Sequence, residues 1–184
     1  MKRANQILKW IIFAAGIVFD ILHFVDPERY PKLISYIATS LIPFVPDLIR
    51  ALKVKVSDEL ELAYLLFIIP AMVVGIDMDL YKVPWHYDKI VHGASGVLVA
   101  FVAKEFADQN KLTKRNWFYI LYILGIVALT AVAWECFEFS YDLIAGGHMQ
   151  ELVSTGVDDT MWDLIVAMVG GGLVAAGLVF CKKK

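Results

Sequence analysis

Acidic and imidazole side chains recur at helical spacing in the second half of the chain, in a pattern that can bind a metal ion. Three pairs lie three or four residues apart: Asp88 and His92, Glu135 and Glu138, and Asp159 and Asp163. Residues at this spacing share one face of a helix, about 5–6 Å from each other. Carboxylate and imidazole ligands together suit Zn²⁺ or Mn²⁺, and oxygen-rich sets suit Mg²⁺ or Ca²⁺. The pattern therefore predicts three helix faces that share a divalent metal ion.

The elements that must position these residues are membrane spans. The chain has 184 residues, of which 59% are apolar, whereas a soluble domain has roughly 45–50% even with glycine counted. Apolar stretches long enough to cross a bilayer, about 17–25 residues each, are predicted at 7–25, 31–50, 60–77, 87–105, 116–138 and 161–181. We therefore expect an all-α, polytopic membrane protein, with residues 1–184 forming one domain and its six transmembrane helices forming one bundle.

The distribution of charge predicts the orientation of these spans. Of the 17 Lys and Arg residues, 13 lie on one side of the predicted spans: at the start of the first span, where Lys9 is one of them, around the connections between spans two and three and between spans four and five, and at the end of the chain. Basic residues resist translocation, so this side is expected to be cytoplasmic. Of the 19 Asp and Glu residues, 13 lie on the other side. We expect a multi-pass protein of the cell membrane, with both termini cytoplasmic and the acidic residues near the outer face.

Small residues extend the acidic faces along the helices and indicate which way these faces point. The Asp88–His92 face continues through Gly96 and Ala100, and that of Asp163 continues through Ala167. Small residues at four-residue spacing let membrane helices approach closely. The acids are therefore expected to face protein. Ionisable groups within a span cost roughly 2.5–3.5 kcal/mol each on insertion scales. The fold must therefore offset their charge, through a bound divalent cation, hydrogen-bonded partners or protonation of some of the acids.

Simpler structural interpretations remain for several of these residues. Asp88, Asp158 and Asp159 could cap the beginning of their helices, because acids are favourable at helix N-termini. His92 could be a neutral buried histidine. Glu135 and Glu138 lie at the end of the fifth predicted span, where the helix dipole disfavours negative charge. These two glutamates are therefore the strongest functional candidates.

Three segments resemble the small polytopic membrane proteins of the YjdF-like family and, more distantly, the VanZ-like proteins. They are YDKIVHGASG at 87–96, WECFEF at 134–139 and DDTMWDLIVAMVGG at 158–171. Asp88, Lys89 and His92 match an Asp-Lys-x-x-His pattern that opens a membrane helix in those families. Glu138 stands where VanZ-like proteins commonly have Gln. The resemblance implies a site at these residues and, through a broader similarity to enzymes that act on lipid head groups, a membrane-lipid substrate.

Two functions from different classes fit these observations. The first is a metal-dependent hydrolase or transferase that acts on a lipid head group. For this function we assign catalytic roles to Glu138, as general base, and to His92 and Lys89. Its metal ligands are expected to come from Asp88, His92, Glu135, Asp159 and Asp163. No nucleic-acid partner is expected.

The second function is a cation-binding or proton-coupled protein involved in transport or sensing. It needs an aqueous path below Asp163, and broken helices would favour it. Only Pro43, Pro46 and Pro70 indicate such breaks.

Overall fold

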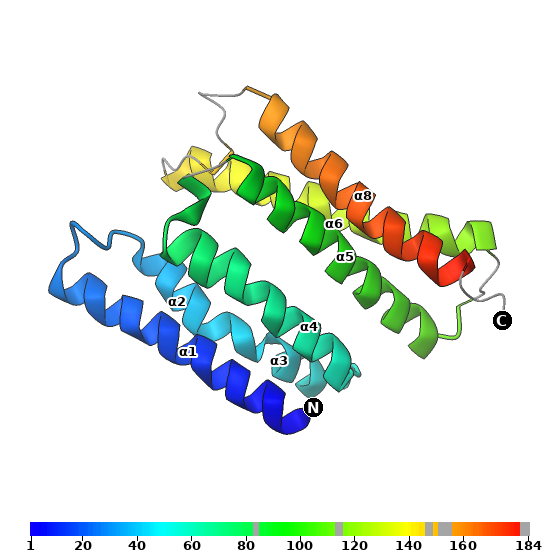
Figure 1. The fold of residues 1–184 in the computed structure, drawn as a ribbon, viewed down its shortest axis with the longest axis horizontal. Helices are drawn as coiled ribbons and strands as arrows, with labels where there is room; N and C mark the ends of the chain where they lie inside the picture. Colours follow the sequence, from blue (N-terminus) through cyan, green and yellow to red (C-terminus); the bar gives the residue numbers. More distant parts are fainter. Residues whose placement is uncertain (83–84, 113–115, 146–148, 151–155, 181–184) are drawn as a thin grey trace. The chain divides into compact units, whose positions relative to one another are not determined.

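The computed structural model describes residues 1–82, 85–112, 116–145, 149–150 and 156–180. Within these residues all regular secondary structure is helical (Figure 1). The chain divides into two compact units, Met1–Tyr87 and Asp88–Lys184, which are described separately below. That all six spans form one bundle stays a prediction.

Six helical segments are long and apolar enough to cross a membrane, which confirms the predicted all-α polytopic fold. They are Lys2–Val25, Leu33–Ala51, Asp58–Asp77, His86–Gln109, Trp117–Ile144 and Asp158–Phe180. Their outer faces are apolar: Phe24, Ile144 and Leu173 are 76%, 85% and 70% exposed. Their buried residues include acids, lysine and histidine. Exposed apolar and buried polar residues are the distribution expected of helices surrounded by lipid. The cytoplasmic orientation of both termini stays a prediction.

The first two spans of unit 1 are helix α1 (Lys2–Val25) and a broken segment. This segment consists of α2 (Leu33–Leu41), the 3₁₀ helix η1 (Ile42–Phe44) and α3 (Val45–Ala51). Pro43 lies in η1, and Pro46 lies in the first turn of α3. Proline has no N–H to donate, so it is tolerated where a new helix begins. The predicted interruption of the second span at these two prolines is confirmed.

The third span changes its hydrogen-bonding pattern at a proline. It begins as α4 (Asp58–Ile68), where the Ser57 side chain accepts a hydrogen bond from Leu60 N at 3.2 Å. It continues as the π-helix η2 (Ile69–Asp77) and is followed by the 3₁₀ helix η3 (Leu80–Lys82). Pro70 lies in the first turn of η2 and cannot donate to an α-helical carbonyl. π-Helical turns are rare and occur frequently at functional sites.

A buried charge network joins α1, α3 and α4 near the N-terminal end of α1. The Lys9 side chain is 1% exposed, and its Nζ lies 2.5 Å from Asp47 Oδ2 and 2.9 Å from Glu61 Oε1. Arg50 Nη2 lies 2.8 Å from Glu61 Oε2, which also accepts from Asn5 Nδ2 at 3.2 Å. Sequence analysis counted Lys9 as a residue that sets orientation. In the folded chain it is also a buried ion-pair partner of two neighbouring helices.

The described helices of unit 2 are α5 (Trp85–Gln109), which belongs to it from Asp88 onward, α6 (Asn116–Ala145) and α8 (Asp158–Phe180), shown in Figure 1. Their common core consists of Ala100, Ala103, Ala107, Tyr119, Ile123, Val127, Ala175 and Val179. Helix α6 ends at Ala145, beyond the predicted residue 138, and α5 ends at Gln109, beyond the predicted 105. Helical hydrogen bonding continues where the apolar run stops. Residue 181, the predicted end of the last span, lies outside the described residues.

Glycine and alanine bring α5 and α8 into main-chain contact. A Cβ atom added to Gly96 would overlap the main-chain oxygen of Ala167, and one added to Gly170 would overlap that of Gly93. Only residues without a bulky side chain permit such an approach. The close packing predicted from the small-residue spacing is therefore confirmed. It fixes the distance between the two helices that carry the acidic residues.

Candidate cation site

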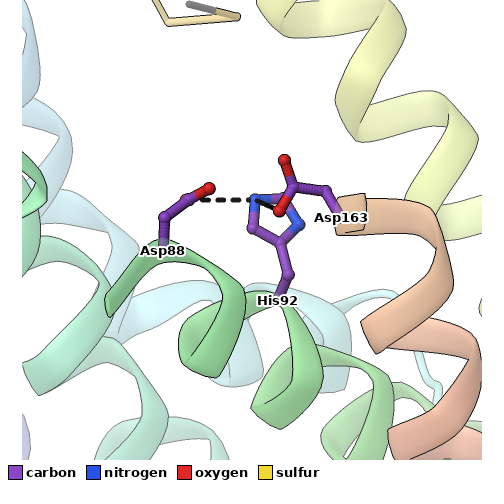
Figure 2. Close-up of side chains that lie close together, drawn as sticks. All are labelled: Asp88, His92 and Asp163. Carbon is purple, nitrogen blue, oxygen red and sulfur yellow. Dashed lines mark ion pairs between the residues drawn. The ribbon is translucent and has the colours of Figure 1, made fainter. Parts of the chain in front are cut away.

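Two carboxylates and one imidazole converge where α5 and α8 begin. Asp88 and His92 lie on α5 and Asp163 lies on α8, and one ligand atom from each lies within 4.8 Å of the others. His92 Nε2 is 3.4 Å from Asp88 Oδ1 and 3.7 Å from Asp163 Oδ1. Figure 2 shows the imidazole between the two carboxylates. The Asp163 side chain is only 1% exposed, so the group faces protein as predicted.

Lys89 is the cationic partner of three aspartates at this site. Its Nζ lies 2.9 Å from Asp88 Oδ2 and 2.8 Å from both carboxylate oxygens of Asp163. It also contacts Asp159 Oδ1. Lys89 is 8% exposed, so these ion pairs are formed away from solvent. The three aspartates and the lysine together leave a formal charge of −2.

Glu135 and Glu138 of α6 are buried close to this group. They are 6% and 7% exposed, and each is near enough to interact electrostatically with His92. Glu138 Oε1 accepts a hydrogen bond of 2.6 Å from Trp134 Nε1. The Thr160 hydroxyl lies beside Glu135, yet neither Glu135 carboxylate oxygen has a hydrogen bond of normal geometry from a described residue. A buried carboxylate without a donor requires a cation or a proton.

The structure thus brings part of the predicted ligand set together. Asp88, His92 and Asp163 form the close group. Asp159 is joined to it through Lys89, and Glu135 lies near it without belonging to it. The predicted assignments of metal ligands and catalytic residues remain predictions.

A family model described as a predicted membrane protein, DUF2238, matches residues 7–184. The chain belongs to this family. The description agrees with the six membrane-spanning helices of the DUF2238 chain. It does not extend to the YjdF-like or VanZ-like groups, so that resemblance stays a prediction. No curated protein and no solved structure matches the chain.

Gln150 was not identified by the sequence analysis. It links the segment that follows α6 to the candidate site. Gln150 is 8% exposed, and its Nε2 donates to Glu135 O at 3.2 Å. Asp142 accepts hydrogen bonds from Met149 N at 2.8 Å and from Gln150 N at 2.9 Å. Gln150 lies outside the helices, where no periodic pattern could indicate it. Trp134 was missed as well. It precedes Glu138 by one helical turn, and this spacing is a signal in the sequence that could have identified it as a partner of Glu138.

We expect Asp142→Ala to loosen this connection in the DUF2238 chain. The substitution leaves the N–H groups of Met149 and Gln150 without their acceptors, at a cost of about 1–3 kcal/mol for a buried group left unpaired. Amide hydrogen exchange should become faster at both residues. Ser140→Ala, which removes an exposed hydroxyl of the same helix, serves as the control. Unchanged exchange in Asp142→Ala would contradict the role of Asp142.

Proposed function

We propose that this protein is a membrane-embedded, metal-dependent enzyme that hydrolyses or transfers an ester bond of a lipid head group. The observation that carries this proposal is the convergence of Asp88, His92 and Asp163 within 4.8 Å. Mixed carboxylate and imidazole groups at this separation are suitable first ligands for Zn²⁺ or Mn²⁺. Mg²⁺ or Ca²⁺ would need further oxygen ligands.

The charge of the site supports a divalent cation. Lys89 neutralises only one of the three aspartates that surround it. Glu135 adds a buried carboxylate that receives no hydrogen bond of normal geometry from the described part of the chain. Uncompensated buried charge is strongly unfavourable. A divalent ion would offset the formal charge of −2 that the aspartates and Lys89 leave. When bound, such an ion polarises a phosphoryl oxygen and makes its bound water more acidic.

The protein groups around the close set have the chemistry that hydrolysis needs. Glu138 is the proposed general base, because its carboxylate is buried and held by Trp134 at 2.6 Å. Lys89 is the proposed contact for a phosphate oxygen, which its ammonium group could bind once a metal ion occupies the carboxylates of Asp88 and Asp163 that it contacts in this structure. Together with the metal ion, it would offset the repulsion between the acidic site and an anionic substrate.

The packing below the site favours an enzyme over a transport pathway. The described core that continues along α5, α6 and α8 consists of closely packed residues such as Ala100, Val127 and Ala175, each 0–1% exposed. Gly96 and Gly170 hold two of these helices in main-chain contact. A pathway for ions needs polar groups along its length. The described core below the site thus offers no polar path along unit 2, which supports a site confined to one end of this unit.

Metal content tests the binding part of the proposal. Detergent-purified protein, dialysed with Zn²⁺, Mn²⁺, Mg²⁺ or Ca²⁺, should retain one ion per chain at this site. Asp163→Asn and His92→Ala should each weaken binding at least about tenfold. Asp158→Asn is the matched control, because it removes an exposed acid from the same first turn of α8. Equal metal content in Asp163→Asn and Asp158→Asn would overturn the assignment.

Turnover of defined lipids tests the catalytic part. The metal-loaded protein is incubated with vesicles of phosphatidylglycerol and phosphatidylethanolamine, and released head groups are measured by mass spectrometry. Glu138→Gln should lower kcat by about 10²–10⁴-fold, as expected for loss of a general base, with little change in metal content. Metal binding without release of either head group would contradict the enzyme and leave the cation-binding alternative.

A further inference from the structure

Asp77, at the end of the third span in unit 1, is a buried acid that the proposed site does not use. Its side chain is 5% exposed, and neither carboxylate oxygen has a hydrogen-bond partner among the described residues. The Thr39 hydroxyl lies beside Asp77 but donates to Ser35 O at 3.1 Å. In this arrangement the Thr39 proton goes to a main-chain oxygen, and Asp77 is left without a hydrogen bond of normal geometry from a described residue.

A second acid and a second hydroxyl lie in the same region of unit 1. Asp20 Oδ2 accepts a hydrogen bond of 3.1 Å from Ser40 Oγ, while Asp20 Oδ1 is buried and has no hydrogen-bond partner in the ranges that the structure describes. Asp20 is close enough to Asp77 for their charges to interact. Thr39 and Ser40 are 0% and 3% exposed. The four oxygen-bearing side chains thus lie close together where α1, α2 and η2 pack.

Lys32 lies close enough to Asp77 for their charges to interact, but it forms its direct contacts with other groups. Lys32 Nζ contacts the main-chain oxygen of Ile76 and Asp79 Oδ1. Burial would raise the pKa of Asp79, but the ammonium groups of Lys32 and Lys82 outweigh burial and hold this pKa below its ordinary value. Asp77 is also the last residue of η2, where the helix dipole disfavours a negative charge and favours a cation.

We propose that Asp20, Thr39, Ser40 and Asp77 form a second cation site, which binds a hard metal ion through oxygen. Carboxylates and hydroxyls are ligands that such ions prefer. The C-terminal ends of broken membrane helices coordinate cations in known transporter folds, and η2 ends a span broken at Pro70. The site lies within unit 1 and has no imidazole, so it differs in composition from the Asp88–His92–Asp163 group.

Cation-dependent thermal stability of the full chain tests this site. Protein in chelated, cation-free detergent buffer receives NaCl, MgCl₂ or CaCl₂, each compared with choline chloride at equal ionic strength. At a saturating concentration, at least one of the three cations should raise the Tm by about 5 °C. Asp77→Asn should abolish this rise and should itself raise the Tm without cation, because it removes a buried charge that has no direct hydrogen-bond partner among the described residues. Glu28→Gln, which removes an exposed acid of the same unit, should behave like the wild type.

Further measurements separate this site from the proposed metal centre. Asp163→Asn should lose metal at the first site and keep the cation-dependent rise in Tm, whereas Asp20→Asn should reduce the rise. No rise with any of the three cations, or an equal rise in Asp77→Asn, would overturn the proposal. An infrared band of a protonated carboxyl group that is present in the wild type and absent from Asp77→Asn is assigned to Asp77. Persistence of this band at saturating cation would also overturn the proposal.

Discussion

Replacing Lys89 with methionine is expected to destabilise unit 2 by about 3–5 kcal/mol, the usual cost of removing one partner from a buried ion pair. Asp88, Asp159 and Asp163 would lose the ammonium group they share. The same substitution should strengthen divalent-metal binding, because Lys89 occupies both oxygens of Asp163 at 2.8 Å. Unfolding should therefore be measured with and without Zn²⁺ or Mn²⁺, and either ion should restore part of the lost stability.

Lys104→Met is the matched control for this experiment. Lys104 lies on the same helix and pairs with Asp108 at 2.9 Å, but its side chain is 39% exposed. Exposed ion pairs contribute about 0–1 kcal/mol, so this variant should be nearly as stable as the wild type. If Lys89→Met is equally stable, the aspartates do not depend on Lys89 for their charge compensation.

Gly96→Ala is expected to destabilise the packing of α5 on α8 by about 1–3 kcal/mol, the usual cost of overpacking. The added methyl group would overlap the main-chain oxygen of Ala167, and a main chain cannot rotate away as a side chain can. The two helices must separate, which moves His92 away from Asp163. Chemical or thermal unfolding should show the loss of stability, and metal affinity should fall in parallel.

Gly177→Ala provides the control for Gly96→Ala. It lies on α8, and an added Cβ at Gly177 meets no atom within 4 Å. Alanine favours a helix over glycine by roughly 0.5–1 kcal/mol, so this variant should be unchanged or slightly more stable. Equal stability of the two variants would mean that α5 and α8 are farther apart at Gly96 than the structure indicates.

The fold was largely predictable because membrane spans leave a strong local signal. Long apolar runs indicate six spans, and Pro43 and Pro46 mark the break in the second span. The bounds were less predictable: α6 continues to Ala145 because helical hydrogen bonds do not depend on hydropathy. The π-helix that begins at Ile69 was not predicted, since one proline does not specify which hydrogen-bonding pattern follows it.

The candidate site was predictable where helical periodicity alone positions the residues. Asp88, His92 and Asp163 follow from four-residue spacing on faces lined with small residues. Lys89 adjoins Asp88 in sequence, and periodicity does not place it on the same face, yet its long side chain reaches the aspartates of α8. Asp77 has no partner at helical spacing, because its neighbours come from other helices.

One exposed thiol makes the depth of the site in a bilayer measurable. Cys136 is exposed and directly follows Glu135, so its side chain leaves α6 at the level of Glu135 but on an exposed face of the helix. A nitroxide can be attached there in a chain with Cys181 replaced by serine. Its collision rate with dissolved oxygen rises with its depth in the bilayer, and its collision rate with a water-soluble nickel complex falls. Paramagnetic relaxation would then report how far below the head groups the carboxylates lie, without altering any of them.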